Sequence, residues 1–458
     1  MTPPERRNKF GLLGPYSFGN LGNAALQLAL VQQIRKRFPS SEIYGCCIDP
    51  QTNRGDGGVL PFPLTRQIDV DHIASAPHPA SAASTETSPQ ENWKSALKRI
   101  PLVHPLYRLA RSIWSKCTSI LKECAFLLRA FRFARGFRIL IVGLGGVIDE
   151  AWNGPWGDAF SIFEWAVVAK LARMPFVFLS VGVEKLESPL TRFFVTHALS
   201  LAGYRSFRDE GSRRKVEALE VGGANLVFPD LAFSLDFTPG ADISATHVPN
   251  RFVGVSPMAY CDPRVWPVKD PTAYQQHLQT LAQLVLWLLR ENYRVALLIT
   301  QIRMDRAPLR ELKEMVLKAA PPEAAARLTE PETQTVDDFL SLASQMDLFV
   351  TSRLHGVVLP LLVNTPVLAL SHSSKVDWLM ADMGLSEFCV SIGDNELGHL
   401  TERIRAIESN QVALRERIRS KVSEYRTALQ SQYDQVLDRK STRLNSSHWI
   451  TSRMPSSA

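Results

Sequence analysis

Length, composition and charge exclude several broad classes of protein for this chain. Its 458 residues, 45% hydrophobic and 21% charged, are too many for one ordinary domain and predict a globular protein with two. No run approaches the roughly 18–20 apolar residues that cross a bilayer, and the opening MTPPERR lacks the apolar core of a secretory signal. We therefore expect a cytoplasmic protein whose only membrane contact is peripheral, at the inner membrane surface.

The charge and the cysteines constrain the partners. A net charge of +7 and a pI of about 9.1 fit an anionic substrate or an acidic membrane surface as well as nucleic acid, so charge alone selects none of them. The six cysteines show no CxxC spacing, and Cys46 and Cys47 are adjacent, which indicates reduced thiols. We expect no metal, no cofactor and no nucleic acid among the partners.

The first half of the chain alternates strand-like and helix-like patterns. It opens with an apolar strand at 10–14, a glycine-rich turn at 15–23 and an apolar-periodic helix at 24–38. The continuous apolar runs 139–142 and 176–183 are typical of strands buried on both faces. Helical patterns at 160–173 and from Ser212, and short runs at 206–209 and 226–230, complete the series. This alternation predicts a parallel sheet covered by helices.

Two segments of this half depart from the alternation. Residues 75–92 are rich in Ala, Ser, Thr and Pro, which predicts a disordered surface loop. Residues 93–138 interleave Arg and Lys with Leu, Ile, Trp and Phe, which predicts a basic insert of two helices broken by Pro101 and Pro105. We assign residues 8–237, including both segments, to an N-terminal Rossmann-like domain.

The alternation restarts after a linker at 238–250. Strand patterns at 252–256, 295–299, 348–350 and 366–370, helical patterns at 274–290 and 336–344, and a long polar helical pattern at 400–437 define a C-terminal Rossmann-like domain, residues 251–438. We predict an α/β protein whose two Rossmann-like domains face a cleft, with ligands at the carboxyl ends of the strands. Residues 441–458 show no periodicity and resemble translated adapter sequence, so we expect a non-native, disordered tail.

The segment Thr351-Ser352-Arg353-Leu354-His355-Gly356 carries the clearest chemical signal. It connects a strand-like run to the start of an apolar helix, and the backbone N–H groups at such a turn favour negative charge. Arg353 adds a bidentate anion-binding group and His355 a titratable acid. That combination suits a substrate that carries phosphate or carboxylate and must receive a proton. The alternative is an arginine paired with a nearby aspartate and a histidine satisfied in the core.

Four motifs, in order along the chain, resemble those of the polysaccharide pyruvyl transferase family over residues 11–392. They are Asn20-Leu21-Gly22-Asn23, Gly143-Leu144-Gly145-Gly146-Val147-Ile148-Asp149, Ser206-Phe207-Arg208-Asp209 with Ser212 and Pro229-Asp230, and Met346-Asp347 with the Arg-Leu-His turn and Ser371-His372-Ser373-Ser374-Lys375. One position departs, because Asn23 stands where the family usually has Asp. That substitution puts an acid–base or metal role at this position in doubt.

The resemblance implies a GT-B-like fold and a defined reaction. Members of this family transfer the enolpyruvyl skeleton of phosphoenolpyruvate to hydroxyls of a sugar, commonly forming a cyclic ketal and releasing phosphate. The acceptor implied is a bacterial cell-surface or exopolysaccharide precursor, often still attached to a lipid carrier. Two alternatives stay open: a GT-B nucleotide-sugar glycosyltransferase, and a non-enzymatic scaffold held on anionic membrane by the insert 93–138.

The reaction implied by the resemblance assigns roles to individual residues. Protonating the methylene carbon needs an acid, for which we expect His355, with His372 as a spare candidate. Asp149 is expected to accept the hydroxyl proton or hold the sugar, unless it only caps a helix. Substrate-binding residues expected from the same reasoning are Arg353, Arg208, Lys375, Asn20, Gly145 and Gly146. For Arg208 the alternative is a structural ion pair with Asp209; for Lys375, a solvated lysine; for Asn20, a turn-shaping role.

Overall fold

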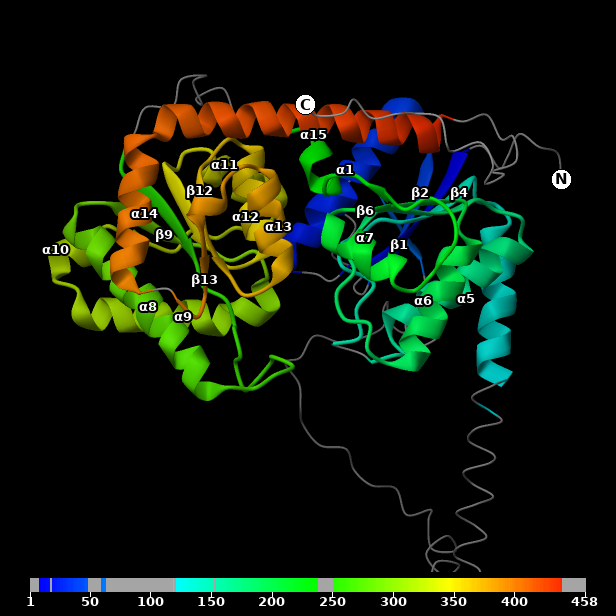
Figure 1. Cartoon of the computed structure of the whole chain (residues 1–458), viewed down its shortest axis with the longest axis horizontal. Helices are drawn as coiled ribbons and strands as arrows, with labels where there is room; N and C mark the ends of the chain where they lie inside the picture. Colours follow the sequence, from blue (N-terminus) through cyan, green and yellow to red (C-terminus); the bar gives the residue numbers. More distant parts are fainter. Residues whose placement is uncertain are drawn as a thin grey trace, which may run out of the picture.

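The computed structural model describes residues 8–16, 19–47, 59–62, 118, 121–151, 154–237, 250–394 and 396–438. These residues form two α/β lobes side by side, one built mainly from the first half of the chain and one from the second (Figure 1). The predicted loop 75–92, most of the insert 93–138 and the tail 441–458 lie outside the described residues. Nowhere in the described ranges does a helix have the length and apolar character needed to cross a membrane.

The first lobe contains a parallel sheet with the strand order β3-β2-β1-β4-β5-β6-β7. The order reverses between β1 and β4, and at such a point the loops after neighbouring strands separate and leave room for a ligand. The strands are β1 (Lys9–Tyr16), β2 (Glu42–Cys47), β3 (Leu60–Phe62), β4 (Ile139–Val142), β5 (Phe176–Val181), β6 (Tyr204–Phe207) and β7 (Leu226–Val227). The helices are α1 (Leu21–Arg37), α5 (Asp158–Leu171), α6 (Pro189–Leu201), α7 (Glu210–Glu217) and the 3-10 helix η3 (Leu231–Ser234), with a further helix at 121–134.

The centre of this sheet is apolar on both faces, as the continuous apolar runs predicted. Along β4, Ile139 and Ile141 belong to a hydrophobic cluster with α1, whereas Leu140 and Val142 belong to a second cluster with α5 and α6. Alternate side chains of a strand point to opposite faces, so every position of β4 is buried. The sheet is therefore held between two helical layers, and only its strand ends can carry polar chemistry.

The second lobe repeats this arrangement with the strand order β10-β9-β8-β11-β12-β13, all pairs parallel. Its order reverses between β8 and β11. The strands are β8 (Phe252–Ser256), β9 (Arg294–Leu297), β10 (Leu328–Thr329), β11 (Leu348–Thr351), β12 (Val367–Ser371) and β13 (Cys389–Ser391). The helices are α8 (Pro271–Arg290), α9 (Ile302–Ala319), α10 (Pro322–Ala325), α11 (Val336–Ala343), α12 (Leu354–Leu362), α13 (Ser374–Asp382), η4 (Ser386–Phe388), α14 (Leu397–Ser409) and α15 (Gln411–Leu437).

The long helix expected at 400–437 is in fact two helices, α14 and α15, so that expectation was wrong. Asn410 interrupts the pattern: its side-chain amide donates to the Ala406 carbonyl at 3.0 Å, and its own carbonyl accepts from the Leu414 N–H at 2.9 Å. An asparagine side chain that bonds a preceding carbonyl competes with the helical hydrogen bonds and ends the helix there. The chain can then change direction and begin α15.

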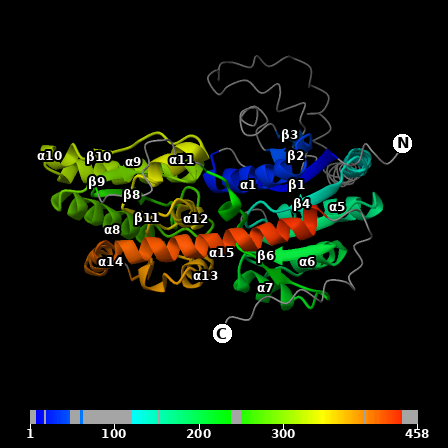
Figure 2. The same ribbon diagram turned by 90° about the horizontal axis from the view of Figure 1, so that it is seen from above.

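Helix α15 lies along both lobes in the two views (Figures 1 and 2). Near its start, Arg415 donates to the carbonyls of Asn364 and Met346 in the second lobe, at 2.6 and 2.9 Å. Near its end, the Gln432 amide donates to the Ser206 hydroxyl of the first lobe at 2.6 Å. The division into domains 8–237 and 251–438 remains our proposal, with α15 as a strap across both.

The two lobes also meet at the start of α1. Helix α1 begins at Leu21, three residues before the predicted start, because the Asn20 side chain caps it by accepting from the Asn23 N–H at 3.1 Å. The Leu21 N–H donates to the Thr300 carbonyl at 2.9 Å, which joins this turn to the loop between β9 and α9. The amino terminus of α1 is thereby held at the boundary between the lobes.

Candidate functional site

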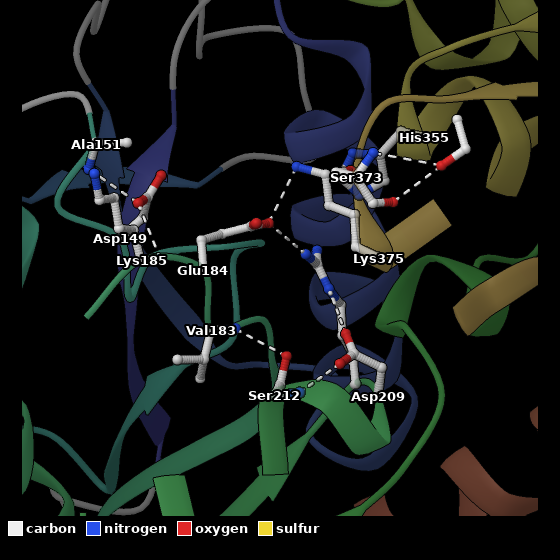
Figure 3. Close-up of polar contacts among 12 residues, drawn as sticks. Asp149, Ala151, Val183, Glu184, Lys185, Asp209, Ser212, His355, Ser373 and Lys375 are labelled. Atoms are coloured by element: carbon white, nitrogen blue, oxygen red, sulfur yellow. Dashed lines mark hydrogen bonds and ion pairs between the residues drawn. The ribbon is translucent and has the colours of Figure 1, made fainter. Parts of the chain in front are cut away.

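The predicted site residues come from the carboxyl ends of strands in both sheets. Asn20, Gly145 and Asp149 follow β1 and β4, and Arg208 follows β6. From the second lobe, Arg353 and His355 follow β11, and Lys375 follows β12. Figure 3 shows Lys375 of the second lobe reaching Glu184 of the first, with His355 drawn beside Lys375. The structure thus brings residues from both lobes to one place, as expected for facing Rossmann-like sheets.

The Arg-Leu-His segment forms a strand-to-helix turn between β11 and α12, as its sequence predicted. Arg353 occupies the N-cap position, and its N–H donates to the Thr351 hydroxyl at 3.3 Å. Position 356 requires glycine, because a Cβ there would lie 2.2 Å from the Thr351 hydroxyl oxygen. The glycine lets α12 pack tightly onto the end of its own strand, which places Arg353 and His355 at the strand's carboxyl edge.

Arg353 is held firmly by one carboxylate. Its Nε and Nη2 donate to the two oxygens of Asp305, at 2.9 and 2.6 Å, and Asp305 is fully buried in α9. The guanidinium also lies over the Trp266 ring, 5.5 Å from its centroid. The predicted alternative, an arginine paired with an aspartate, is therefore part of the geometry. The edge of the guanidinium formed by Nε and Nη2 is thus fixed by Asp305, and Nη1 remains for a ligand.

Arg208 is surrounded by three carboxylates, none of which is close enough for a strong bond. Its guanidinium nitrogens lie 3.3 Å from Glu184, 3.4 Å from Asp209 and 3.9 Å from Asp230. Gly182 leaves the necessary space, because a Cβ there would lie 2.4 Å from the Arg208 guanidinium carbon. The ion pair with Asp209 expected as an alternative is present, but it is one of three and does not hold Arg208 in one direction.

Glu184 joins Lys375 to Arg208 across the two lobes. Lys375 Nζ lies 3.1 Å from Glu184 Oε1, the oxygen that also accepts from Arg208 Nη2 (Figure 3). Burial acts to raise the pKa of Glu184, but Lys375 and Arg208 outweigh it, so the pKa is lowered. Burial lowers the pKa of the Lys375 ammonium, against the opposing effect of Glu184. Lys375 is therefore not simply a solvated lysine, because it forms an ion pair with Glu184 between the two lobes.

His355 packs against the amino-terminal turn of α1 and faces Asp230. A Cβ on Gly22 would lie 2.1 Å from His355 Nδ1, so the glycine is what admits the imidazole. His355 Nε2 lies 3.8 Å from Asp230 Oδ2, beyond hydrogen-bonding distance. Burial lowers the pKa of His355 to about 4; Asp230 acts to raise it, and Arg208 and Lys375 lower it further. Without a ligand the imidazole is neutral at pH 7.

Asp149 does not cap a helix; its carboxylate organises the loop between β4 and α5. Oδ1 accepts from the N–H groups of Ala151 and Lys185, at 2.9 and 3.4 Å (Figure 3). Burial raises the pKa of Asp149, and nearby Glu184 raises it further. Burial, together with Asp149, also raises the pKa of Asp158 to about 6. A carboxylate with a raised pKa is a better proton acceptor toward a hydroxyl than an exposed one.

The glycine-rich turns supply close backbone approach more than side-chain chemistry. Gly145 has φ +78°, and a Cβ there would lie 3.0 Å from the Asn23 side-chain oxygen. A Cβ on Gly146 would lie 3.5 Å from Glu184 Oε1 and 3.6 Å from Arg208 Nη2. Asn23 therefore packs against the second glycine-rich turn, where its amide can shape the loop. Asn20 is committed to capping α1, so the turn-shaping alternative describes what its side chain does here.

His372, the spare candidate for the acid, lies among aromatic rings of the second lobe. Its ring centroid is 5.7 Å from Trp266 and 6.0 Å from Tyr260, both on the loop after β8. Burial lowers its pKa to about 3, and Lys375 and Arg353 lower it further. Both histidines therefore have a pKa lowered mainly by burial and then by two cations, and each is opposed by one carboxylate, Glu184 for His372 and Asp230 for His355.

Several buried polar atoms at this place have no hydrogen-bond partner among the described residues. They are Arg208 Nε, Asp230 Oδ2, Ser352 Oγ, His355 Nε2, His372 Nδ1 and Ser373 Oγ. Buried polar groups in folded proteins are nearly always satisfied, so such a group of orphaned donors and acceptors is typical of a ligand site. The same described ranges hold no group of His, Cys, Asp or Glu arranged to bind a metal ion.

Three acidic residues at the site had no role in the sequence prediction. Glu184 could have been found, because it is the first charged residue after a buried strand. Asp230 appeared within a motif, yet nothing in the sequence indicated that it faces His355. Asp305 lies inside helix α9, a segment for which no helix was predicted, and its contact with Arg353 depends wholly on tertiary structure.

Comparisons with known proteins agree with this architecture. The S. aureus MnaA–UDP co-structure matches with a TM-score of 0.50 at 11% identity, covering 90% of both chains. A structure described as a UDP-N-acetylglucosamine 2-epimerase from Listeria monocytogenes matches with a TM-score of 0.50 at 12% identity, covering 93% of this chain and 97% of that one. These likenesses concern the fold alone and confirm the GT-B-like prediction.

Comparison with curated protein sequences gives no match. The sequence profile described as polysaccharide pyruvyl transferase matches residues 20–374, which is more than half of the chain and includes all four motifs except Lys375, the residue directly after the match. The match confirms the expected resemblance and identifies a transferase. The chain belongs to the polysaccharide pyruvyl transferase family.

Proposed function

We propose that this transferase uses phosphoenolpyruvate as donor and a cell-surface glycan precursor as acceptor. The observation that supports this most is the convergence of three cations at the largely buried imidazole of His355: Arg208 and Lys375 act on the imidazole, and Arg353 acts on Lys375. Phosphoenolpyruvate carries a phosphate and a carboxylate, and guanidinium groups bind both. Asn20, Gly145 and Gly146 contribute the backbone and turn geometry beside the clamp.

The reaction divides among these residues as follows. His355 gives a proton to the methylene carbon of phosphoenolpyruvate, which leaves an oxocarbenium-like centre at the adjacent carbon. A sugar hydroxyl attacks that carbon while Asp149 takes the hydroxyl proton. The bond to phosphate then breaks, with Lys375 and the arginines stabilising the leaving dianion. A second hydroxyl attacks the same carbon and closes the ketal ring, giving its proton to the His355 imidazole that the first step left neutral. One phosphate is released for each pyruvyl group transferred.

The low pKa of His355 gives the donor a part in its own activation. At a pKa of about 4 the imidazole carries almost no proton at pH 7. A bound phosphate and carboxylate would bring negative charge close to the ring, and nearby negative charge favours the protonated form. They would also neutralise Arg208 and Lys375, which lower the pKa of His355 without a ligand. Donor binding then loads the acid that the next step uses.

A nucleotide-sugar glycosyltransferase is the second candidate, because the S. aureus match is a UDP co-structure and Arg353 with Lys375 could hold a diphosphate. Thermal unfolding separates the two donors. Phosphoenolpyruvate should raise the melting midpoint of the wild type and UDP-glucose or UDP-N-acetylglucosamine should not. Release of inorganic phosphate from phosphoenolpyruvate in the presence of a glycan acceptor completes the test; stabilisation only by the UDP-sugars would replace the proposed donor.

We also propose cytoplasmic localisation with peripheral contact between the basic insert and anionic membrane. Within the described part of the insert, Leu121 and Leu128 are 68% and 60% exposed, and Lys122, Arg129 and Arg132 lie on the same helix. Exposed apolar side chains next to cations bind lipid headgroups through both effects. Co-sedimentation with phosphatidylserine vesicles at low salt tests the proposal. The double variant Leu121→Ser/Leu128→Ser should bind the vesicles more weakly than the wild type. Equal pelleting with and without vesicles would refute it.

A further inference from the structure

A cavity of about 500 Å³ opens beside the candidate site in the first lobe. Its walls come from the loops after β4 and β5 and from α6 and α7, at the carboxyl edge of the sheet. The lining includes Asp149 and Glu184, which the cavity shares with the site described above, together with Lys185, Arg192 and Lys215. A ligand in this cavity would reach the proposed base, Asp149, while lying outside the cluster of Arg208, Lys375 and His355.

The charged side chains that line this cavity are only partly paired with one another. Lys185 is neutralised by Glu187 at 3.0 Å, and Glu184 is neutralised by Lys375 and Arg208. Arg192 donates its Nε to the Leu186 carbonyl at 2.9 Å, and Lys215 donates to the Val183 carbonyl at 3.1 Å. Neither cation forms an ion pair with any carboxylate of the described residues. Arg192 and Lys215 therefore line the cavity without a carboxylate of the described residues at ion-pairing distance, although the Lys215 charge still lowers the pKa of Glu184 at longer range.

The carbonyl contacts also orient these two cations. A guanidinium whose Nε is bound to Leu186 keeps both terminal nitrogens for another group, and planar guanidinium nitrogens suit the oxygens of a phosphate or carboxylate. The Lys215 ammonium has three hydrogens and uses one on Val183. Among the lining carboxylates of the described residues, Asp149 has no cation within ion-pairing distance; burial raises its pKa, and Lys375 lowers it only at longer range. The cavity pairs a proton acceptor with an anion-binding wall.

We infer that this cavity is the acceptor subsite and that it selects a sugar carrying an anionic group, a phosphate ester or a uronic carboxylate, bound by Arg192 and Lys215. The inference deepens the proposed function and rests on it, since Asp149 must receive the proton of the attacking hydroxyl. The anion would anchor the sugar in the cavity while the hydroxyls project past Asp149 toward the donor. Specificity would then depend on charge as well as on sugar shape.

Calorimetry with small acceptor probes tests this inference. The probes are the methyl glycosides of glucose, galactose and mannose, the corresponding hexose 1-phosphates, and glucuronic and galacturonic acid. In the wild type at least one anionic probe should bind about tenfold more tightly than its neutral counterpart, which corresponds to about 1.4 kcal/mol. Preference for the 1-phosphates identifies a phosphate ester, and preference for the uronic acids identifies a carboxylate. Equal affinity for neutral and anionic probes would overturn the inference.

Matched variants locate the effect. Arg192→Gln and Lys215→Gln should each reduce the preference for the anionic probe, and the double variant should abolish it. Lys170→Gln removes an exposed lysine of α5 that does not line the cavity and should leave the preference unchanged. Binding of phosphoenolpyruvate should be the same in all of these proteins, and the melting midpoint shows whether Lys215→Gln still folds; Arg192→Gln gives the answer if it does not.

The two proposals fail in different ways. If neutral and anionic probes bind the double variant in the same ratio as the wild type, the acceptor inference is wrong even though phosphate release continues. If phosphoenolpyruvate neither binds nor releases phosphate with any acceptor, the proposed function itself is wrong. A wild type that binds the anionic probe more tightly and also releases phosphate faster with it supports both.

Discussion

The two arginines of the candidate site, one from each lobe, are held in different ways. Arg353 donates two short hydrogen bonds to a single buried aspartate, Asp305, and rests on Trp266. Arg208 lies 3.3 to 3.9 Å from three carboxylates, Glu184, Asp209 and Asp230, and its one hydrogen bond to them, from Nη2 to Glu184, is long. The second lobe offers a guanidinium fixed by two short hydrogen bonds, whereas the first offers one shared among three carboxylates at longer distances.

This difference suggests a division of labour within the donor site. A guanidinium already fixed by Asp305 loses little conformational entropy when it binds an anion, so Arg353 supplies geometry. Arg208 can exchange one of its distant carboxylates for an anion that changes shape as phosphate leaves. Glu184 also binds Lys375 of the second lobe. A movement of Arg208 would therefore alter the Glu184–Lys375 contact between the lobes.

The largest expected effect comes from His355, which belongs to the second lobe but faces Asp230 of the first. His355→Ala should reduce turnover about 10²–10⁴-fold while phosphoenolpyruvate still binds, because an acid acts on the transition state. Phosphate release and calorimetry measure the two quantities. Calorimetry in buffers of different ionisation enthalpy at pH 7 should also show less proton uptake on donor binding in the variant. Turnover like that of the wild type would remove His355 from the mechanism and move the acid to His372.

Lysine substitutions test the contrast between the arginines directly. Arg353→Ala should weaken phosphoenolpyruvate binding by roughly 2–3 kcal/mol, and Arg353→Lys should recover little of that loss because a point charge cannot replace a planar fork. Arg208→Lys should retain more of the wild-type affinity than Arg353→Lys, since its contacts are already long and spread over three carboxylates. Dissociation constants from calorimetry decide the order. If the two lysine variants lose equal affinity, the proposed division of labour is wrong.

The second lobe should also lose stability at acidic pH because of its buried histidines. Burial lowers the pKa of His277 and of His355 to about 4 and that of His372 to about 3, and all three are in the second lobe. A depressed histidine pKa means that the unfolded chain binds protons more readily than the fold. Stability is therefore unaffected above pH 6.5 or so and declines as the pH falls from there toward 4.

His277→Phe isolates one of these contributions away from the site. His277 is 2% exposed on α8, and its two ring nitrogens have no partner among the described residues. Between pH 6.5 and pH 4 the variant should lose less unfolding free energy than the wild type. The two losses should differ by about 3 kcal/mol at pH 4. Urea unfolding at several pH values measures it. His399→Gln, at an exposed histidine, should reproduce the wild-type slope, and a His277→Phe slope equal to that of the wild type would contradict the prediction.

The smallest effect is expected outside both lobes. Removing residues 441–458 should leave the melting midpoint within about two degrees, because this segment has no apolar period with which to join either core. Differential scanning calorimetry of the shortened chain provides the measurement. A larger decrease would mean that the tail packs against the fold and is part of the native protein.

The sequence predicted the elements of this site better than the partnerships between them. Apolar runs located β4, β5, β8 and β11, because strands buried on both faces leave a continuous signal. The turn carrying Arg353 and His355 was found for the same reason: it directly follows one of those strands. Short edge strands such as β3 and β10 carry only two or three residues and give no comparable pattern.

What could not be predicted are contacts whose two sides are far apart in the chain. The space for the His355 ring depends on the absence of a side chain at Gly22, and nothing near either residue indicates that they meet. Likewise, an aspartate partner for Arg353 was only the alternative interpretation, and the partner, Asp305, belongs to a helix that was not predicted. Such pairs follow from how distant elements pack, within one lobe or between the two, which a single sequence does not contain as a local pattern.

Helix α15 has a consequence for the order in which this protein can be completed during synthesis. Its last turns satisfy buried hydroxyls of the first lobe, with Gln432 on Ser206 and Tyr433 on Ser234 at 2.6 and 2.9 Å. The amino-terminal lobe leaves the ribosome first and would ordinarily fold first. Here some of its buried hydrogen bonds are made by α15, far along the chain, so this surface is complete only after α15 has been synthesised. A nascent chain stalled before Leu437 would expose that surface to chaperones.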